Sequence, residues 1–159
     1  AVGASFVRVN VHTGVYATDQ GFIEGRADET LRYRRLLSQR VAILADVHVK
    51  HAVPISQPDI ARAARETAYR GMADGLIVTG PATGEPVDID ELRRVREAVP
   101  DRRLFVGSGA TAETVQALLS VADGIIVGTS IKPDRDPSQP VDVRLARALV
   151  RAARPGATA

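Results

Sequence analysis

The sequence contains no cysteine. This absence excludes disulfide bonds, thiol catalysis and thiolate metal sites, and it fits a reducing compartment. Aromatic residues make up only 4% of the chain, and no basic run carries interleaved aromatics of the kind that bind nucleic acid. No apolar run approaches the ~18 residues of a membrane-spanning helix. We therefore expect a cytoplasmic protein that neither binds nucleic acid nor is integral to a membrane.

Net charge is also small. The chain has 21 basic and 19 acidic residues, which leaves a formal charge of +2. Lysine occurs only as Lys50 and Lys132, and the other basic residues are arginines. Such a balance predicts solvated helix surfaces rather than a face that binds a polyanion. With 159 residues, 45% of them hydrophobic, the chain is long enough for a single domain over residues 1–159 with a sizeable core.

Short apolar runs rich in valine and isoleucine alternate with segments of helical periodicity. The predicted strands are Phe6–Val11, Val41–Val49, Gly75–Val78, Arg103–Val106 and Gly124–Val127. The predicted helices are Glu29–Leu37, Ile60–Arg70, Asp90–Val99, Thr111–Ser120 and Val143–Ala153. Strands and helices that alternate at this spacing predict an α/β fold with a parallel sheet.

An internal repeat narrows the fold. The stretch "ADGLIVTG" (Ala73–Gly80) returns as "ADGIIVGT" (Ala122–Thr129), with one unit that contains "LFVGSG" between the copies. Repeated single βα units favour a (β/α) barrel over a doubly wound sheet. A complete barrel has eight units, and the chain supplies five. We therefore predict a partial (β/α)8 TIM barrel, completed either by an N-terminal segment outside this chain or by further copies in a homo-oligomer.

Polar side chains occupy one face of the first two predicted strands. Alternation places Asn10 and His12 on one face of the first strand, and Asp46, His48 and Lys50 on one face of the second. The outward face of a barrel strand packs under helices, so these polar residues are expected inside, toward the C-terminal strand ends where barrels build active sites. We predict that all five are catalytic. The alternatives are a salt-bridge network that only fixes the barrel and a divalent metal held by His12, Asp46 and His48.

Two glycine-rich turns follow the last two strands, "VGSGAT" (Val106–Thr111) and "VGTSIK" (Val127–Lys132). Small residues expose backbone amides there, and a following helix N-terminus would make an anion cradle. In many barrels the loops after strands 7 and 8 hold a substrate phosphate. The predicted phosphate-binding residues are Gly107, Ser108, Gly109, Gly128 and Thr129. Glycine is also common at any tight turn.

Two other loops are candidates for contact with a substrate. The first is "TGPATGEPVD" (Thr79–Asp88), in which Thr79 and Gly80 are the predicted substrate ligands, although a plain connector is the alternative. The second is the long segment Thr13–Thr30, for which we predict a lid because it exceeds the usual length of a βα loop.

The stretches "FVRVNVHTGVYATDQGFIEGRADETLRYRR", "ILADVHVKHA", "ADGLIVTGPATGEPVD", "LFVGSGAT" and "ADGIIVGTSIK" resemble the BtpA family. The resemblance extends over nearly the whole chain. It implies a TIM barrel of which this chain carries strands 4–8, and a link to the biogenesis of membrane complexes such as photosystem I.

The family is similar to phosphate-binding barrels, and this similarity extends to the fold only. Together with the polar face and the glycine turns, it leads us to expect a protein that binds a phosphorylated small molecule, a sugar or nucleoside phosphate. Acid–base chemistry at the C-terminal barrel face would suit a phosphosugar isomerase, lyase or hydrolase. The alternative is a non-catalytic assembly factor for a membrane complex such as photosystem I.

Overall fold

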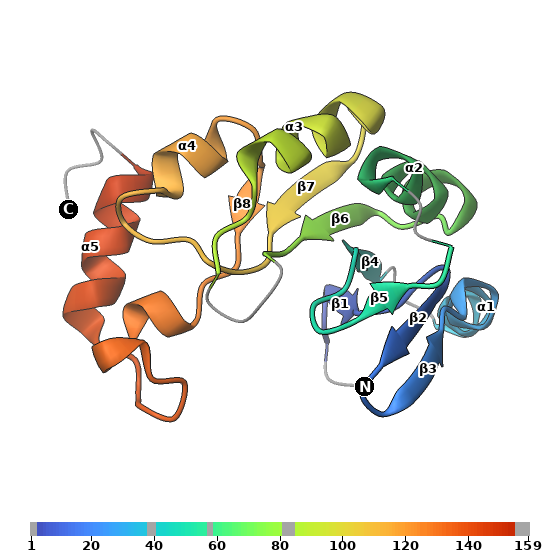
Figure 1. The fold of residues 1–159 in the computed structure, drawn as a ribbon, viewed down its shortest axis with the longest axis horizontal. Coiled ribbons are helices and arrows are strands. Elements are labelled where there is room, and N and C mark those ends of the chain that lie inside the picture. The colour runs from blue at the N-terminus through green and yellow to red at the C-terminus, as the bar shows by residue number, and fades with distance from the viewer. Residues whose placement is uncertain (1–2, 38–40, 57–58, 81–84, 155–159) are drawn as a thin grey trace.

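The computed structural model describes residues 3–37, 41–56, 59–80 and 85–154. Its main sheet has five strands in the order β1-β4-β6-β7-β8, and all four pairings are parallel (Figure 1). The strands are β1 (Phe6–Val9), β4 (Ala42–Val47), β6 (Gly75–Val78), β7 (Arg103–Val106) and β8 (Gly124–Ile125). Neighbours in the sheet follow one another along the chain, as the strands of a barrel do.

A helix follows each of these strands along the chain. The helices are α1 (Ala27–Leu36), α2 (Ile60–Arg65) with its π-helical continuation η1 (Glu66–Arg70), α3 (Ile89–Ala98), α4 (Val115–Leu119) and α5 (Val143–Ala153). Two short 3-10 turns, η2 (Thr129–Ile131) and η3 (Pro133–Arg135), precede α5. The prediction of five parallel βα units from a (β/α)8 barrel is confirmed. None of the helices in the described part of the chain is long and apolar enough to cross a membrane.

A second, antiparallel sheet occupies the segment predicted to be a lid. The strands β2 (Val15–Thr18) and β3 (Gly21–Glu24) form a hairpin, and β5 (Val53–Pro54) pairs with β2. The order is therefore β3-β2-β5. Pairing with β5 ties the hairpin to the chain that follows β4, so the segment predicted to be a lid contains an ordered sheet.

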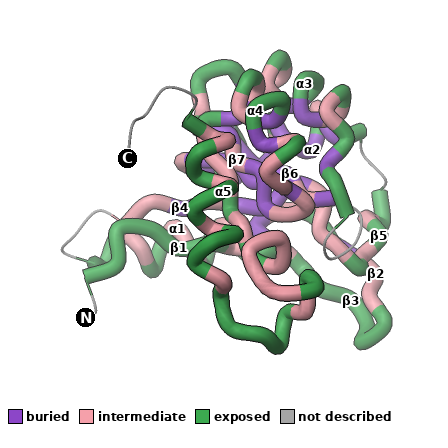
Figure 2. The backbone as a smooth tube through the Cα atoms, turned by 90° about the vertical axis from the view of Figure 1, so that its left-hand side faces the viewer, coloured by how far each residue is buried: buried purple, intermediate pink, exposed green. Residues whose placement is uncertain are grey.

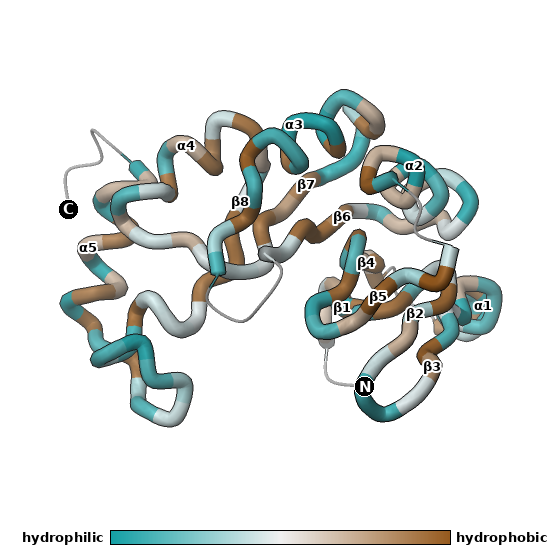
Figure 3. Tube along the Cα trace, in the orientation of Figure 1, coloured by the Kyte–Doolittle hydropathy of each residue, from teal (hydrophilic) through white to brown (hydrophobic). Residues whose placement is uncertain are grey.

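The apolar core lies between the sheet and α2, α3 and α4, where the buried positions gather in Figure 2. Its strand residues alternate along β4, β6 and β7, as expected for the face that packs under helices; they are Ile43, Ala45, Val47, Leu76, Val78, Leu104 and Val106. On the helix side, Leu92 and Val95 of α3 are 0% and 1% exposed. Figure 3 shows the corresponding hydrophobic colouring along β6 and β7. Burying each large aliphatic side chain contributes roughly 1.5–3 kcal/mol.

The repeated "ADG" motif has a structural explanation at the N-terminal ends of the strands. In the second copy, Asp123 accepts hydrogen bonds from the backbone N–H of Leu104, at 2.8 Å, and from Arg96 Nη2, at 2.6 Å. The Asp123 N–H in turn donates to the carbonyl of Leu104. One aspartate therefore joins the start of the preceding strand to the helix that covers it.

Asp74 repeats this arrangement in the first copy. Its Oδ2 accepts from the backbone N–H of Ile43, at 2.8 Å, and from Arg34 Nη1, at 2.6 Å. Its own N–H donates to the carbonyl of Ile43. The two copies of the motif are thus two copies of one clamp, and the glycine that follows each aspartate begins the next strand.

Replacing Asp123 with alanine should lower the free energy of unfolding by about 1.5–3 kcal/mol, because the Leu104 amide and Arg96 both lose a charged acceptor. Urea unfolding measures this change. Asp90→Ala is the matched control, since the Asp90 side chain makes an exposed ion pair with Arg93, and such pairs contribute at most about 1 kcal/mol.

The effect of Asp123 should also depend on pH. Burial alone would raise the pKa of Asp123, but the Leu104 amide and the Arg96 guanidinium outweigh it and hold this pKa below its usual value. A carboxyl with a lowered folded-state pKa stabilises the protein above the unfolded value of about 3.9 and loses that contribution as pH falls through its folded pKa. The stability gap between the wild type and Asp123→Ala should therefore narrow below about pH 4. A stability difference between the two proteins that stays constant with pH would show that the ionised Asp123 carboxylate does not stabilise the fold.

Candidate active site

A partly buried ion pair lies on the inner face of the sheet. Asp46 is near the end of β4, and its side chain is 1% exposed. Arg8 of the neighbouring strand β1 donates to both of its oxygens, from Nη2 to Oδ1 at 2.7 Å and from Nε to Oδ2 at 3.0 Å. Such two-point contacts fix the carboxylate orientation. Alternation along the first predicted strand puts Arg8 on the same face as Asn10, but we did not predict Arg8 as a site residue.

The pKa of Asp46 is raised above its usual value. Burial is the main cause, and it outweighs the hydrogen bonds and charge of Arg8 and the charge of Lys50, which favour the ionised form. A carboxyl whose pKa is shifted upward accepts a proton more readily at neutral pH than an ordinary aspartate does. Shifts of this kind are frequent in catalytic acids and bases.

Several predicted site residues meet above Asp46. They line a pocket of about 420 Å³ whose wall consists of Arg8, Asn10, Asp46, Lys50, His51 and Thr79. The structure therefore brings together three of the predicted catalytic residues and one predicted substrate ligand. His51, which we did not predict as a site residue, also lines this pocket.

The predicted phosphate-binding residues also lie together. Gly107, Ser108, Gly109, Gly128 and Thr129 line a second pocket of about 190 Å³, along with Ser130 and Lys50. The hydroxyls of Ser108 and Ser130 are buried and form no hydrogen bond within the described part of the chain. Lys50 is common to this pocket and to the one above Asp46. The two pockets are therefore adjacent.

Close packing explains two of these glycines. A Cβ on Gly107 would lie 2.5 Å from Thr79 Cγ2 and 2.7 Å from Ile77 Cγ2. Gly109 has φ +74°, and a Cβ there would collide with the backbone carbonyl of Glu85. Gly128 differs, because a Cβ there would meet no atom within 4 Å. Gly107 and Gly109 are thus required by the fold, whereas Gly128 leaves its backbone open to the pocket.

The helix contribution to this pocket is smaller than predicted. The helix after the first glycine turn begins at Val115 and has only five residues, instead of the predicted range Thr111–Ser120. After Gly128 the chain forms the 3-10 turn η2. Hydroxyls, backbone groups and Lys50 are therefore the groups that this pocket offers to an anion.

His48 does not share the face of Asp46 in the predicted way. The strand β4 ends at Val47, and His48 has φ +55°, so strand alternation stops there. His48 lines a neighbouring pocket of about 650 Å³ together with Lys50, Thr79 and Gly80. Residues 81–84 of the predicted substrate loop lie outside the described residues, and Pro86, Val87 and Asp88 line this same pocket.

His12, which we also predicted to be catalytic, lies in a different region from Asp46. The strand β1 ends at Val9, and the chain bends at Asn10. His12 therefore leaves the polar face, becomes 1% exposed and bonds through Nε2 to the carbonyl of Gly71 at 2.8 Å. Among the described residues, no group of three or more histidine, aspartate or glutamate side chains could hold a metal ion. The predicted metal set of His12, Asp46 and His48 is not assembled.

The fold and site define a partial (β/α)8 barrel with a polar pocket at the C-terminal ends of its strands. The chain belongs to the BtpA family, whose model, described as "BtpA family", matches residues 1–155.

Curated relatives agree with this assignment. The chain is 47% identical over 151 residues to the photosystem I biogenesis protein BtpA of Synechocystis sp., an alignment that covers 95% of this chain and 53% of that protein. An uncharacterized protein of Pyrococcus furiosus is 44% identical, with 95% and 56% covered. The putative sgc region protein SgcQ of Escherichia coli is 35% identical, with 84% and 50% covered. The chain thus spans about half the length of these relatives.

Among solved structures, the YdjI aldolase from Escherichia coli K12 matches with a TM-score of 0.45 and 19% sequence identity. The match covers 80% of this chain and 48% of the aldolase.

Replacing Arg8 with methionine should raise the pKa of Asp46 further, because the largest influence that favours its ionised form is removed. Titration of the aspartate carboxyl carbons by 13C NMR measures this pKa, with Asp46→Asn to assign the resonance. Lys50→Met is the matched control and should raise the pKa less, since Lys50 is the weakest of the influences. An unchanged pKa in Arg8→Met would show that the ion pair does not control the ionisation of Asp46.

Proposed function

We propose that the chain binds a phosphorylated small molecule, a sugar or nucleoside phosphate, and acts on it by acid–base chemistry at Asp46. The observation that carries this proposal is the position of Lys50, which lines both the Asp46 pocket and the pocket of the glycine turns. A phosphate at the glycine turns would therefore leave the rest of the molecule beside the Asp46 carboxyl.

The glycine-turn pocket has the chemistry of an anion site. The buried hydroxyls of Ser108 and Ser130 have no partner within the described ranges and can donate to phosphate oxygens. Lys50 supplies a positive charge, and charged hydrogen bonds are stronger than neutral ones. The open space at Gly128 lets a ligand approach the backbone closely.

The Asp46 pocket has the chemistry of a proton-transfer site. Arg8 fixes the Asp46 carboxylate in one orientation. The raised pKa of Asp46 brings this carboxyl closer to the range in which a group can both take and give a proton. Asn10 and Thr79 line the same pocket and can orient hydroxyl or carbonyl groups of a substrate. An isomerase, lyase or hydrolase reaction would use these parts, and each requires a proton to move at a carbon or an oxygen.

Thermal unfolding with ribose 5-phosphate tests the anion site, because a ligand that binds only the folded state raises its melting temperature. We expect the melting temperature of the wild type to rise, and Gly128→Val to remove this rise by filling the space beside the backbone. Ala148→Val is the control, since position 148 is exposed on α5 and lies outside both pockets. A rise of equal size in Gly128→Val would contradict the proposed anion site.

The same ligand series tests the role of Asp46. Asp46→Asn should keep the melting-temperature rise, because the glycine turns are unchanged, and should turn over none of the phosphosugars that the wild type converts. Proton and phosphorus NMR of the reaction mixtures measure turnover. Full activity in Asp46→Asn would exclude Asp46 as the acid or base.

A second candidate function, as a non-catalytic assembly factor for a membrane complex such as photosystem I, is favoured by an apolar surface on the small sheet. Phe22 and Val53, which are 74% and 56% exposed, both lie opposite Ala17 across the β3-β2-β5 sheet. The Synechocystis relative carries a name of this kind. If this function holds, accumulation of the complex in cells that depend on the protein should fall with Phe22→Ser and survive Asp46→Asn. The opposite pattern would favour the enzyme.

A further inference from the structure

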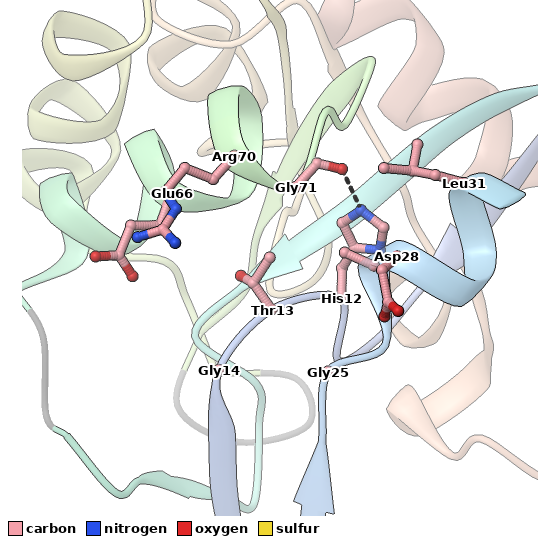
Figure 4. A pocket seen from close by; sticks show the side chains of 10 residues that line it. His12, Thr13, Gly14, Gly25, Asp28, Leu31, Glu66, Arg70 and Gly71 are labelled. Carbon is pink, nitrogen blue, oxygen red and sulfur yellow. Dashed lines mark hydrogen bonds between the residues drawn. The ribbon is translucent and has the colours of Figure 1, made fainter.

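A third region of the molecule, apart from the strand ends, contains a pocket with its own polar groups. It has a volume of about 440 Å³ and lies between α1 and η1 (Figure 4). Its wall consists of residues from the β1–β2 connection, the start of α1 and η1, and none of them lines the Asp46 or glycine-turn pockets. The pocket therefore needs an explanation separate from the proposed phosphosugar site.

His12 is the buried polar residue of this pocket. Its Nε2 lies 2.8 Å from the Gly71 carbonyl, which can only accept, so Nε2 is the donor of this bond. In the neutral imidazole this leaves Nδ1 as an acceptor. No donor reaches Nδ1 from the described part of the protein. Buried acceptors of this kind are rare in native proteins, where a water or a ligand usually satisfies them.

The residues around His12 are tightly packed. A Cβ on Gly25 would lie 2.5 Å from Thr13 Cα, and one on Gly71 would lie 2.7 Å from Thr67 O and 3.0 Å from His12 Cδ2. The hydroxyls of Thr13 and Thr67 are 2.9 Å apart and hydrogen-bonded. These contacts hold the imidazole in one position against the end of η1.

The π-helical turn contributes directly to this arrangement. In η1 the Gly71 N–H donates to the Glu66 carbonyl, five residues earlier, at 2.8 Å. The turn ends with Met72 at φ +53°, and the Gly71 carbonyl is left to accept from His12. Turns of this type inside helices occur frequently at functional sites.

Charged groups of both signs line the pocket on opposite sides. Figure 4 shows Asp28 on the side of His12, with Glu66 and Arg70 on the other side beyond Thr13. Asp28 is exposed, and its pKa is held low mainly by the hydrogen bond from Arg32, so it is ionised at neutral pH. Arg70 is exposed and makes no ion pair with any residue in the described ranges.

We propose that this pocket binds a small amino-carboxylate, with the ammonium group donating to His12 Nδ1 and facing Asp28, and with the carboxylate facing Arg70. An ammonium has donors and no acceptor, which suits a ring nitrogen and a carboxylate. The guanidinium of Arg70 suits the other end of such a ligand. Nδ1 is itself buried, so binding requires a local movement that opens this atom to the pocket.

Calorimetric titration with glycine, L-serine and L-glutamate tests the proposal, with methylamine and acetate as probes that each carry only one of the two charged groups. At least one amino acid should bind, and methylamine and acetate should bind about tenfold more weakly or worse, since each lacks a charged hydrogen bond. Equal binding of either half-probe, or no binding of any amino acid, would overturn the proposal.

Imidazole 15N NMR of the same samples reports on His12 directly, with His12→Asn to assign its resonances. The free protein should show the tautomer protonated on Nε2, and the bound amino acid should move the Nδ1 resonance while those of His48 and His51 stay. A Nδ1 resonance that does not respond would overturn the assignment of His12.

Arg70→Gln tests the other end of the pocket without disturbing buried groups. It should weaken amino-acid binding about tenfold or more, whereas Arg65→Gln, an exposed position on α2 outside the pocket, should leave binding unchanged. Equal affinities in these two variants would exclude the proposed contact with the carboxylate. Because both residues are exposed, this comparison holds even if the His12 variant does not fold.

Discussion

The helices that cover one side of the parallel sheet require that face of each strand to be apolar, and the position of the site follows from this constraint. Ile43, Ala45 and Val47 occupy the covered face of β4, so Asp46 has to lie on the opposite face. A buried carboxylate there is costly unless it is paired. Arg8, which pairs with Leu44 in the register of β1 and β4, reaches along the sheet to supply that partner. The ion pair is thus a consequence of the fold as well as the centre of the site.

Small residues at the strand ends extend this ion pair into a continuous surface. A Cβ on Gly107 would lie 3.2 Å from Arg8 Nη2, so the guanidinium from β1 reaches across to the end of β7. Thr79 also contacts this glycine and lines the Asp46 pocket. Lys50 then connects that pocket to the glycine turns. Arg8 and Lys50 therefore place two positive charges near both the buried carboxyl and the glycine turns, which is the electrostatic pattern that the proposed phosphorylated ligand requires.

Sequence periodicity correctly predicted the strands, and it failed for two histidines that lie beyond the strand ends. The five strands and the face that Asp46 occupies follow from alternation within strands. Asn10 and Lys50 lie just beyond the strand ends, and they join Asp46 in one pocket because parallel strand ends converge. His12 and His48 lie beyond the last residues of β1 and β4, where alternation no longer applies. The left-handed conformation of His48 has no glycine to signal it. The β2–β3 hairpin was missed because its strands are short. The contact of Arg8 with Asp46 was missed because it joins two strands that are far apart in the sequence.

The connection after β1 divides its polar residues between two regions of the molecule. Asn10 lines the Asp46 pocket, and His12, two residues later, lines the pocket between α1 and η1. A displacement of His12 therefore has a short covalent path to Asn10. Coupling between two binding events is reciprocal. A ligand of the pocket between α1 and η1 that altered phosphosugar binding would therefore have its own affinity altered by the same factor. The tight contacts at Gly25 and Gly71 oppose movement of His12 alone. Any coupling between the two pockets would therefore involve movement of the whole connection from Asn10 to His12.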